Sequence, residues 1–168
     1  YRAADQNLPA GESYGIRAAR AIEEVILREG PDTVGALCLE PITAGGGVIT
    51  PPEGYWETVQ EICKKYDILL HIDEVVCGVG RTGTWFGYQN YDIKPDIVTM
   101  SKSLSGYGLP LAVVMMRPEL DQWAPGEHNG TFRGNNLAFV TATATLAHYW
   151  ADTSFAKDVE RKGRLVSN

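Results

Sequence analysis

Residues 68–74 read ILLHIDE, a short apolar run that ends in two acidic side chains. Three other runs are built in a similar way, namely VGALCL at 34–39, IVTM at 97–100 and LAVVMM at 111–116. Short, nearly continuous apolar runs are typical of strands buried on both faces of a parallel sheet. These four runs therefore predict the strands of one mainly parallel sheet.

Helical periodicity separates these strand candidates. In residues 12–29 the apolar side chains recur on one face, and Gly30 and Pro31 form a stop signal. Thr50 is the expected N-cap of the next helix, which runs to Tyr66. Further helices are expected at 137–150 and 154–166, with a short one near 118–123. Alternating strands and helices predict an α/β fold with helices on both faces of the sheet.

Composition narrows the class of protein. The chain has 168 residues, of which 44% are hydrophobic and 10% are aromatic. This composition favours one globular domain over a disordered chain. A net charge of −6 gives a nucleic acid or an anionic membrane surface no electrostatic support. Three cysteines within apolar segments favour a reducing compartment, and no stretch has the length of a membrane span. We therefore expect a soluble, cytoplasmic protein.

Three charged residues follow the predicted strands: Glu40, Asp73 and Lys102. Ligands of parallel sheets bind beyond the carboxyl ends of the strands, where these residues fall. Each acid taken alone could equally cap a helix. Lys102 lies among small residues, and desolvation there would lower its pKa and make it an amine nucleophile and proton carrier.

Lys102 and Asp73 together match one cofactor. Pyridoxal phosphate needs a lysine that holds its aldehyde as a Schiff base, and a carboxylate that keeps its pyridine nitrogen protonated. Neighbouring strand ends can supply the two groups. Spacing alone leaves other uses of these residues open.

Two other signals are weaker. Residues 78–83, GVGRTG, fit the dinucleotide pattern G-x-G-x-x-G, but the following TWFG at 84–87 is a poor start for the helix that this motif requires. We expect Arg81 in that motif to form a structural ion pair. The three histidines have no metal-site spacing, so no metal is expected.

Three segments resemble the class III aminotransferases, which are fold-type I pyridoxal-phosphate enzymes that act mostly on terminal amines. The segments are EPITAGGGVITPPEGYW at 40–56, HIDEVVCGVGRTGTWFG at 71–87 and KPDIVTMSKSLSGYGLP at 94–110. The resemblance implies transfer of an amino group from such an amine to a 2-oxo acid.

The resemblance also assigns residues. It makes Lys102 the Schiff-base lysine and Asp73 the partner of the pyridinium nitrogen. Val75 would pack on the cofactor ring, and Glu40 would support the site near Asp73. Thr131, in HNGTFRGNN at 128–136, matches a threonine that reaches the cofactor phosphate of the neighbouring subunit, which implies a homodimer with a shared active site.

The two halves of the chain resemble different subgroups. Residues 1–98 are similar to taurine–pyruvate-type aminotransferases, and residues 99–168 to L-2,4-diaminobutyrate aminotransferase of ectoine synthesis. Gly45 stands where members that use ornithine or 4-aminobutyrate have a glutamate, which favours the subgroup that uses pyruvate.

Family members are much longer than this chain. Residues 1–168 would be part of the cofactor-binding large domain, without its N-terminal segment and without the C-terminal small domain. Such a part should leave apolar sheet faces uncovered and should not catalyse transamination alone. The alternative is a non-catalytic structural or partner-binding piece.

Overall fold

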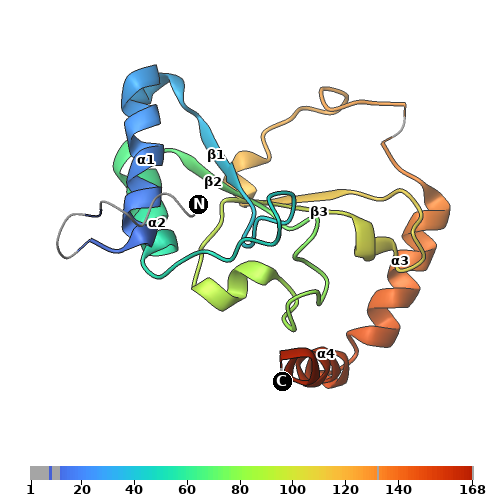
Figure 1. Cartoon of the computed structure of the whole chain (residues 1–168). Helices are drawn as coiled ribbons and strands as arrows, with labels where there is room; N and C mark the ends of the chain where they lie inside the picture. Colours follow the sequence, from blue (N-terminus) through green and yellow to red (C-terminus); the bar gives the residue numbers. More distant parts are fainter. Residues whose placement is uncertain (1–7, 9–11, 132, 168) are drawn as a thin grey trace.

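The four predicted strands form one sheet in the computed structural model, which describes residues 8, 12–131 and 133–167 (Figure 1). The strands are β1 (Ala36–Leu39), β2 (Leu69–Asp73), β3 (Ile97–Met100) and β4 (Val113–Met116). They lie in the order β1-β2-β3-β4. The first three are parallel and β4 is antiparallel to β3. The mainly parallel α/β fold is confirmed.

The helices follow the predicted periodicity. The α-helices in the described residues are α1 (Tyr14–Glu29), α2 (Tyr55–Tyr66), α3 (Asn136–Tyr149) and α4 (Ser154–Ser167). The connections of the described chain contain four short 3-10 helices: η2 (Pro31–Thr33), η3 (Gly87–Tyr91), η4 (Lys102–Ser105) and η5 (Pro118–Leu120). Ser13 Oγ caps α1 by accepting from the Ile16 amide, and Gly30 ends the helix at φ +92°.

The start of α2 was predicted wrongly. The helix begins at Tyr55, and Gly54 in the left-handed conformation, not Thr50, is its N-cap. Two consecutive prolines lie between the two positions, and the ring of Pro52 disfavours the helical conformation for Pro51. The chain therefore stays irregular until glycine allows the turn into the helix.

One face of the sheet carries the core. Leu70 and Ile72 of β2 are buried against α1 and α2, together with Trp56 and Val59 of α2. An ion pair from Glu23 to Lys65 at 2.7 Å and a hydrogen bond from the Tyr66 hydroxyl to Glu23 also tie the two helices together.

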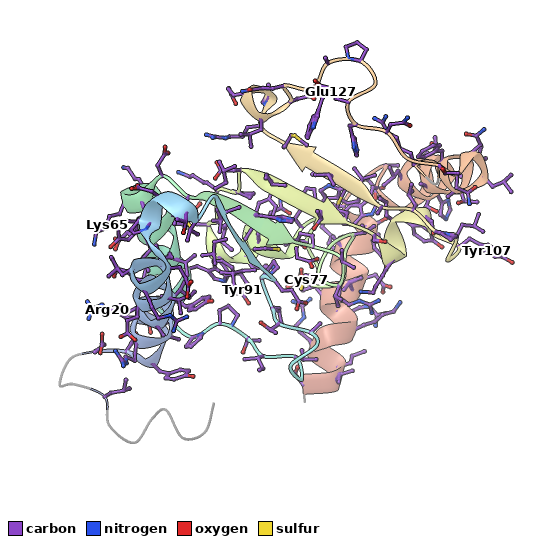
Figure 2. The ribbon with its side chains drawn as sticks, turned by 90° about the horizontal axis from the view of Figure 1, so that it is seen from above. Arg20, Lys65, Cys77, Tyr91, Tyr107 and Glu127 are labelled. Atoms are coloured by element: carbon purple, nitrogen blue, oxygen red, sulfur yellow. The ribbon has the colours of Figure 1, made fainter. Side chains whose placement is uncertain are left out.

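The other face of the sheet is half-exposed. Leu69 and Ile97 point into a cavity of about 1280 Å³ that the segment between β4 and α3 covers in part. In Figure 1 that segment arches away from the sheet, and in Figure 2 its residue Glu127 lies far from the body of the chain. Val114 of β4 is 54% exposed. The prediction of uncovered apolar sheet surface is confirmed.

The C-terminal helices lie at the end of the sheet opposite to α1 and α2 (Figure 1). Helix α3 packs against η4, where a Cβ on Gly106 would come within 1.7 Å of Thr145 Oγ1. Among the described residues, no helix combines the length and the apolarity needed to cross a bilayer.

Candidate functional site

Asp73 is the last residue of β2 and lies half-buried at the carboxyl end of the sheet. Its Oδ1 accepts a hydrogen bond of 2.8 Å from the Val75 amide, which fixes the carboxylate on the turn that follows the strand. Asp73 is in register with Thr99 of β3. The next amide, that of Glu74, donates to the Thr99 carbonyl at 2.8 Å. The end of β2 is thereby attached to the strand that leads to Lys102.

Lys102 begins η4, directly beyond β3, and has φ +50°. A non-glycine residue in the left-handed region is strained, and such strain persists only where the surrounding structure holds it. Here Leu104 and Ser105 of η4 are buried, and Ser101 Oγ donates to the Leu111 carbonyl at 2.7 Å. The backbone on both sides of Lys102 is therefore anchored.

The side chain of Lys102 is exposed, so the predicted desolvation of this amine is not met within the described chain. No salt bridge to a described residue engages the amine. Lys102 therefore presents a reachable primary amine on a fixed main chain.

Glu40 follows β1 at the same edge of the sheet and is half-buried. Its Oε2 accepts from the Ala44 amide at 3.0 Å and so orders the glycine-rich loop that contains Gly45. Neither Glu40 nor Asp73 caps an α-helix; each binds an amide of the loop that follows its own strand. The helix-cap alternative for the two acids is therefore wrong, and Val75, half-buried beside Asp73, completes this edge.

Thr131 follows Lys102 in the sequence and lies in the segment between β4 and α3. Its exposed side chain lines a cavity of about 740 Å³ together with Ser101, residues 110–112 and the start of α3. The cavity thus reaches the residue that precedes Lys102. The role of Thr131 towards a neighbouring subunit stays a prediction.

Sequence reasoning missed the role of Glu74. Glu74 is 1% exposed, and its carboxylate accepts from two consecutive amides, those of Gly87 at 2.9 Å and Tyr88 at 2.8 Å. Burial raises the pKa of Glu74, and the two amide hydrogen bonds oppose that rise. The glycines that follow it in the motif, Gly78 and Gly87, were the available signal, because both leave room for this side chain.

The expectation that no α-helix follows the motif at 78–83 is confirmed, whereas the ion pair expected of Arg81 is not formed within the described chain. The segment forms turns and leads into the 3-10 helix η3, so the α-helix that a dinucleotide fingerprint requires does not follow it. Arg81 forms no ion pair with any residue that the structure describes; its side chain is exposed at the edge of a cavity. In the same described part, no three histidine, cysteine, aspartate or glutamate side chains gather as metal ligands.

Lys102 and Asp73 are of the two residue types that the expected cofactor, pyridoxal phosphate, requires. The cofactor needs an amine and a carboxylate at the two ends of its ring. Asp73 lies at the carboxyl end of β2, and Lys102 follows the carboxyl end of the adjacent parallel strand β3. The residues present therefore fit the cofactor.

Comparison with known proteins places the chain among aminotransferases. The family described as "Aminotransferase class-III" matches residues 2–168. The chain is 81% identical over 97 residues to the hypotaurine/taurine–pyruvate aminotransferase of Paracoccus denitrificans, covering 57% of the chain and 21% of that protein. It is 73% identical over 165 residues to the taurine–pyruvate aminotransferase of Rhodobacter capsulatus, covering 93% and 36%.

Diaminobutyrate enzymes match as well. The diaminobutyrate–2-oxoglutarate transaminase of Halalkalibacterium halodurans is 52% identical over 139 residues, covering 83% of the chain and 32% of that protein. Both expected subgroups are thus among the relatives. The chain spans at most about a third of the length of these three relatives.

Solved structures agree with this fold. A transaminase solved with L-ala has a TM-score of 0.71 and 43% identity, over 84% of this chain and 32% of that one. An omega transaminase from Pseudomonas jessenii, in complex with PMP, has a TM-score of 0.60 and 39% identity, over 84% and 28%.

Proposed function

Because the chain belongs to the class-III aminotransferase family, we propose that it forms the lysine-bearing part of a pyridoxal-phosphate-dependent aminotransferase. The reaction is transfer of the amino group of a terminal amine to a 2-oxo acid. The observation that carries this proposal is the placement of Lys102 and Asp73 at the ends of adjacent parallel strands. The relative solved with PMP supports the choice of cofactor.

Each site residue has a role that its chemistry allows. Bound pyridoxal phosphate supplies an electron sink for the carbon that loses its proton. Lys102 holds the cofactor through its amine and, once released, carries that proton. Asp73 balances the positive charge on the ring nitrogen, Val75 packs on the ring, and Glu40 orders the loop beside Asp73.

Thr131 extends the proposal to a homodimer. Its exposed hydroxyl would bind the phosphate of the cofactor held by the partner subunit, so that two subunits share each active site. The exposure of Thr131 and the cavity beside it leave space for such a contact. The three cysteines, which are unpaired, support a cytoplasmic setting.

Taurine or a similar omega-amino compound with pyruvate is the substrate pair that we place first. The taurine–pyruvate relative shares 73% of aligned residues against 52% for the diaminobutyrate relative, and Gly45 has no side chain to engage an arginine. Diaminobutyrate is the alternative donor. Because the second sheet face is half-exposed, we expect no turnover from these 168 residues alone.

Covalent labelling tests the cofactor site directly. The chain is mixed with pyridoxal phosphate, reduced with borohydride and mapped by peptide mass spectrometry. We expect the reduced cofactor on Lys102, its loss in Lys102→Ala and its retention in Lys94→Ala, an exposed lysine outside the site. Labelling spread over surface lysines, unchanged by Lys102→Ala, would remove this lysine from the proposal.

Asp73 is tested separately in the longer enzyme. Asp73→Asn keeps the shape of the side chain but loses its charge, so covalent attachment at Lys102 should persist while turnover slows greatly. Turnover equal to that of the unmodified enzyme would take Asp73 out of the mechanism.

A further inference from the structure

Glu74 is a buried carboxylate that the proposed reaction does not use. Its two oxygens accept from the amides of Gly87 and Tyr88, which begin η3, thirteen and fourteen residues further along the chain. Buried carboxylates are costly unless hydrogen bonds or charges compensate them. No cationic side chain among the described residues pairs with it, so the two amides provide the compensation.

Two glycines of the motif make room for this carboxylate. A Cβ on Gly87 would lie 2.8 Å from Cys77 Cβ and 3.3 Å from Glu74 Oε2. A Cβ on Gly78 would lie 2.8 Å from the Glu74 carbonyl oxygen and 3.4 Å from Oε2. Neither glycine has a positive φ, so both are required for space rather than for conformation. The spacing from Glu74 to Gly78 and Gly87 thus serves one contact.

The main chain of Glu74 connects this contact to the candidate site. Its amide donates to Thr99 of β3 at 2.8 Å, and its carbonyl accepts from Gly78 at 2.9 Å. The residue before it, Asp73, accepts from the residue after it, Val75. Three consecutive residues are therefore held by β3, by the loop and by each other.

We propose that Glu74 is the positioning residue of this site: its carboxylate clamps the Gly87 and Tyr88 amides against the end of β2 and thereby holds Asp73 in place. The clamp itself consists of the hydrogen bonds that the Glu74 carboxylate accepts from the two amides. Its consequence for catalysis rests on the proposed function, in which Asp73 faces the cofactor.

Amide hydrogen exchange in the chain gives a direct readout. The Val75 amide donates to Asp73, so its protection reports whether the Asp73 carboxylate is held. Glu74→Ala leaves two amides without their acceptor, and we expect Val75, Gly87 and Tyr88 to exchange about tenfold faster or more, as loss of hydrogen bonds to a charged group predicts. Glu74→Gln keeps one acceptor oxygen and should restore part of the protection.

In the Glu74 variants, the core amides of α2 should exchange as in the unmodified chain. Glu57 is an exposed residue of that helix, and the control variant Glu57→Gln should also exchange as the unmodified chain does. If Val75 keeps its protection in Glu74→Ala, the positioning role is refuted. Should that variant unfold as a whole, Glu74→Gln decides: unchanged Val75 protection there also refutes the proposal, and selective loss supports it.

A second readout links the clamp to the cofactor. The affinity for pyridoxal phosphate, measured by absorbance, should fall in the order unmodified chain, Glu74→Gln, Glu74→Ala. Equal affinities alongside lost Val75 protection would leave Glu74 a purely structural residue and overturn the positioning role. A lack of binding by the unmodified chain would count against the proposed function, while the exchange experiment would still decide whether Glu74 holds Asp73.

Discussion

The strained backbone of Lys102 leads to a stability prediction that contrasts two small replacements. Lys102 has φ +50°, a region that costs a residue with a Cβ about 1–2 kcal/mol and costs glycine almost nothing. Replacing alanine by glycine also loosens the unfolded chain, at a cost of about 0.5–1 kcal/mol. The difference makes Lys102→Gly more stable than Lys102→Ala by about 0.5–1 kcal/mol.

The same pair of replacements at Lys64 is the matched control. Lys64 is an exposed residue of α2 with ordinary helical geometry, where glycine is less stable than alanine by about 0.5–1 kcal/mol. The two sites should therefore differ in sign. Both contrasts remove the amine, so its charge and contacts cancel within each pair.

Urea unfolding followed by far-UV circular dichroism measures the four free energies of unfolding. Lys102→Gly should raise the midpoint over Lys102→Ala, and Lys64→Gly should lower it against Lys64→Ala. If glycine at position 102 were destabilising by as much as at position 64, Lys102 would not be strained. The idea that η4 stores strain at the candidate catalytic amine would then be refuted.

Two further changes test contacts that stabilise the fold. Gly87→Ala places a methyl group 2.8 Å from Cys77 Cβ and should lower the free energy of unfolding by about 2 kcal/mol through overpacking. The control Gly35→Ala, whose methyl group meets nothing within 4 Å, should be near neutral. Equal urea midpoints for the two variants would contradict this. Glu23→Gln should cost about 0.5 kcal/mol at neutral pH. Hydrogen bonds from Lys65 and Tyr66 lower the pKa of Glu23, so its contribution is present above the pKa of an exposed glutamate and is lost as the pH falls through the lowered value. The melting temperatures of Glu23→Gln and the unmodified chain should thus converge in acid. The control Glu61→Gln should melt like the unmodified chain at every pH. A difference between Glu23→Gln and the unmodified chain that persists in acid would exclude an ionic origin of the Glu23 contribution.

Local patterns predicted the elements whose ends have strong signals. The strand at 97–100 was predicted residue for residue, and the end of α1 followed from Gly30, because apolar runs and helix stops act within a few residues. The start of α2 was missed because it depends on the backbone conformations of Pro51, Pro52 and Gly54 in the turn before the helix. A pattern search sees a good capping residue at Thr50 but not the conformation of the residues after it.

The order of the strands was the only part of the sequence pattern that allowed the site residues to be placed together. Parallel strands bring their carboxyl ends to one edge, so Glu40, Asp73 and Lys102 could be placed together from the order of the runs. The exposure of Lys102 could not be predicted, because it depends on what else covers the sheet. Glu74 was missed because its partners lie thirteen residues away in a segment without regular periodicity.

The adjacent acids Asp73 and Glu74 take different tasks because a strand alternates its side chains. Successive residues of a strand point to opposite faces. Glu74 directly follows β2 and continues this alternation: it is 1% exposed and binds the amides of Gly87 and Tyr88, while Asp73 stays half-buried at the end of the strand. The buried acid can compensate its charge only with amides, and those amides belong to the loop that must be held. A site that needs one available carboxylate thus obtains its support from the neighbouring one, and a one-residue shift of β2 against β3 would exchange the two tasks.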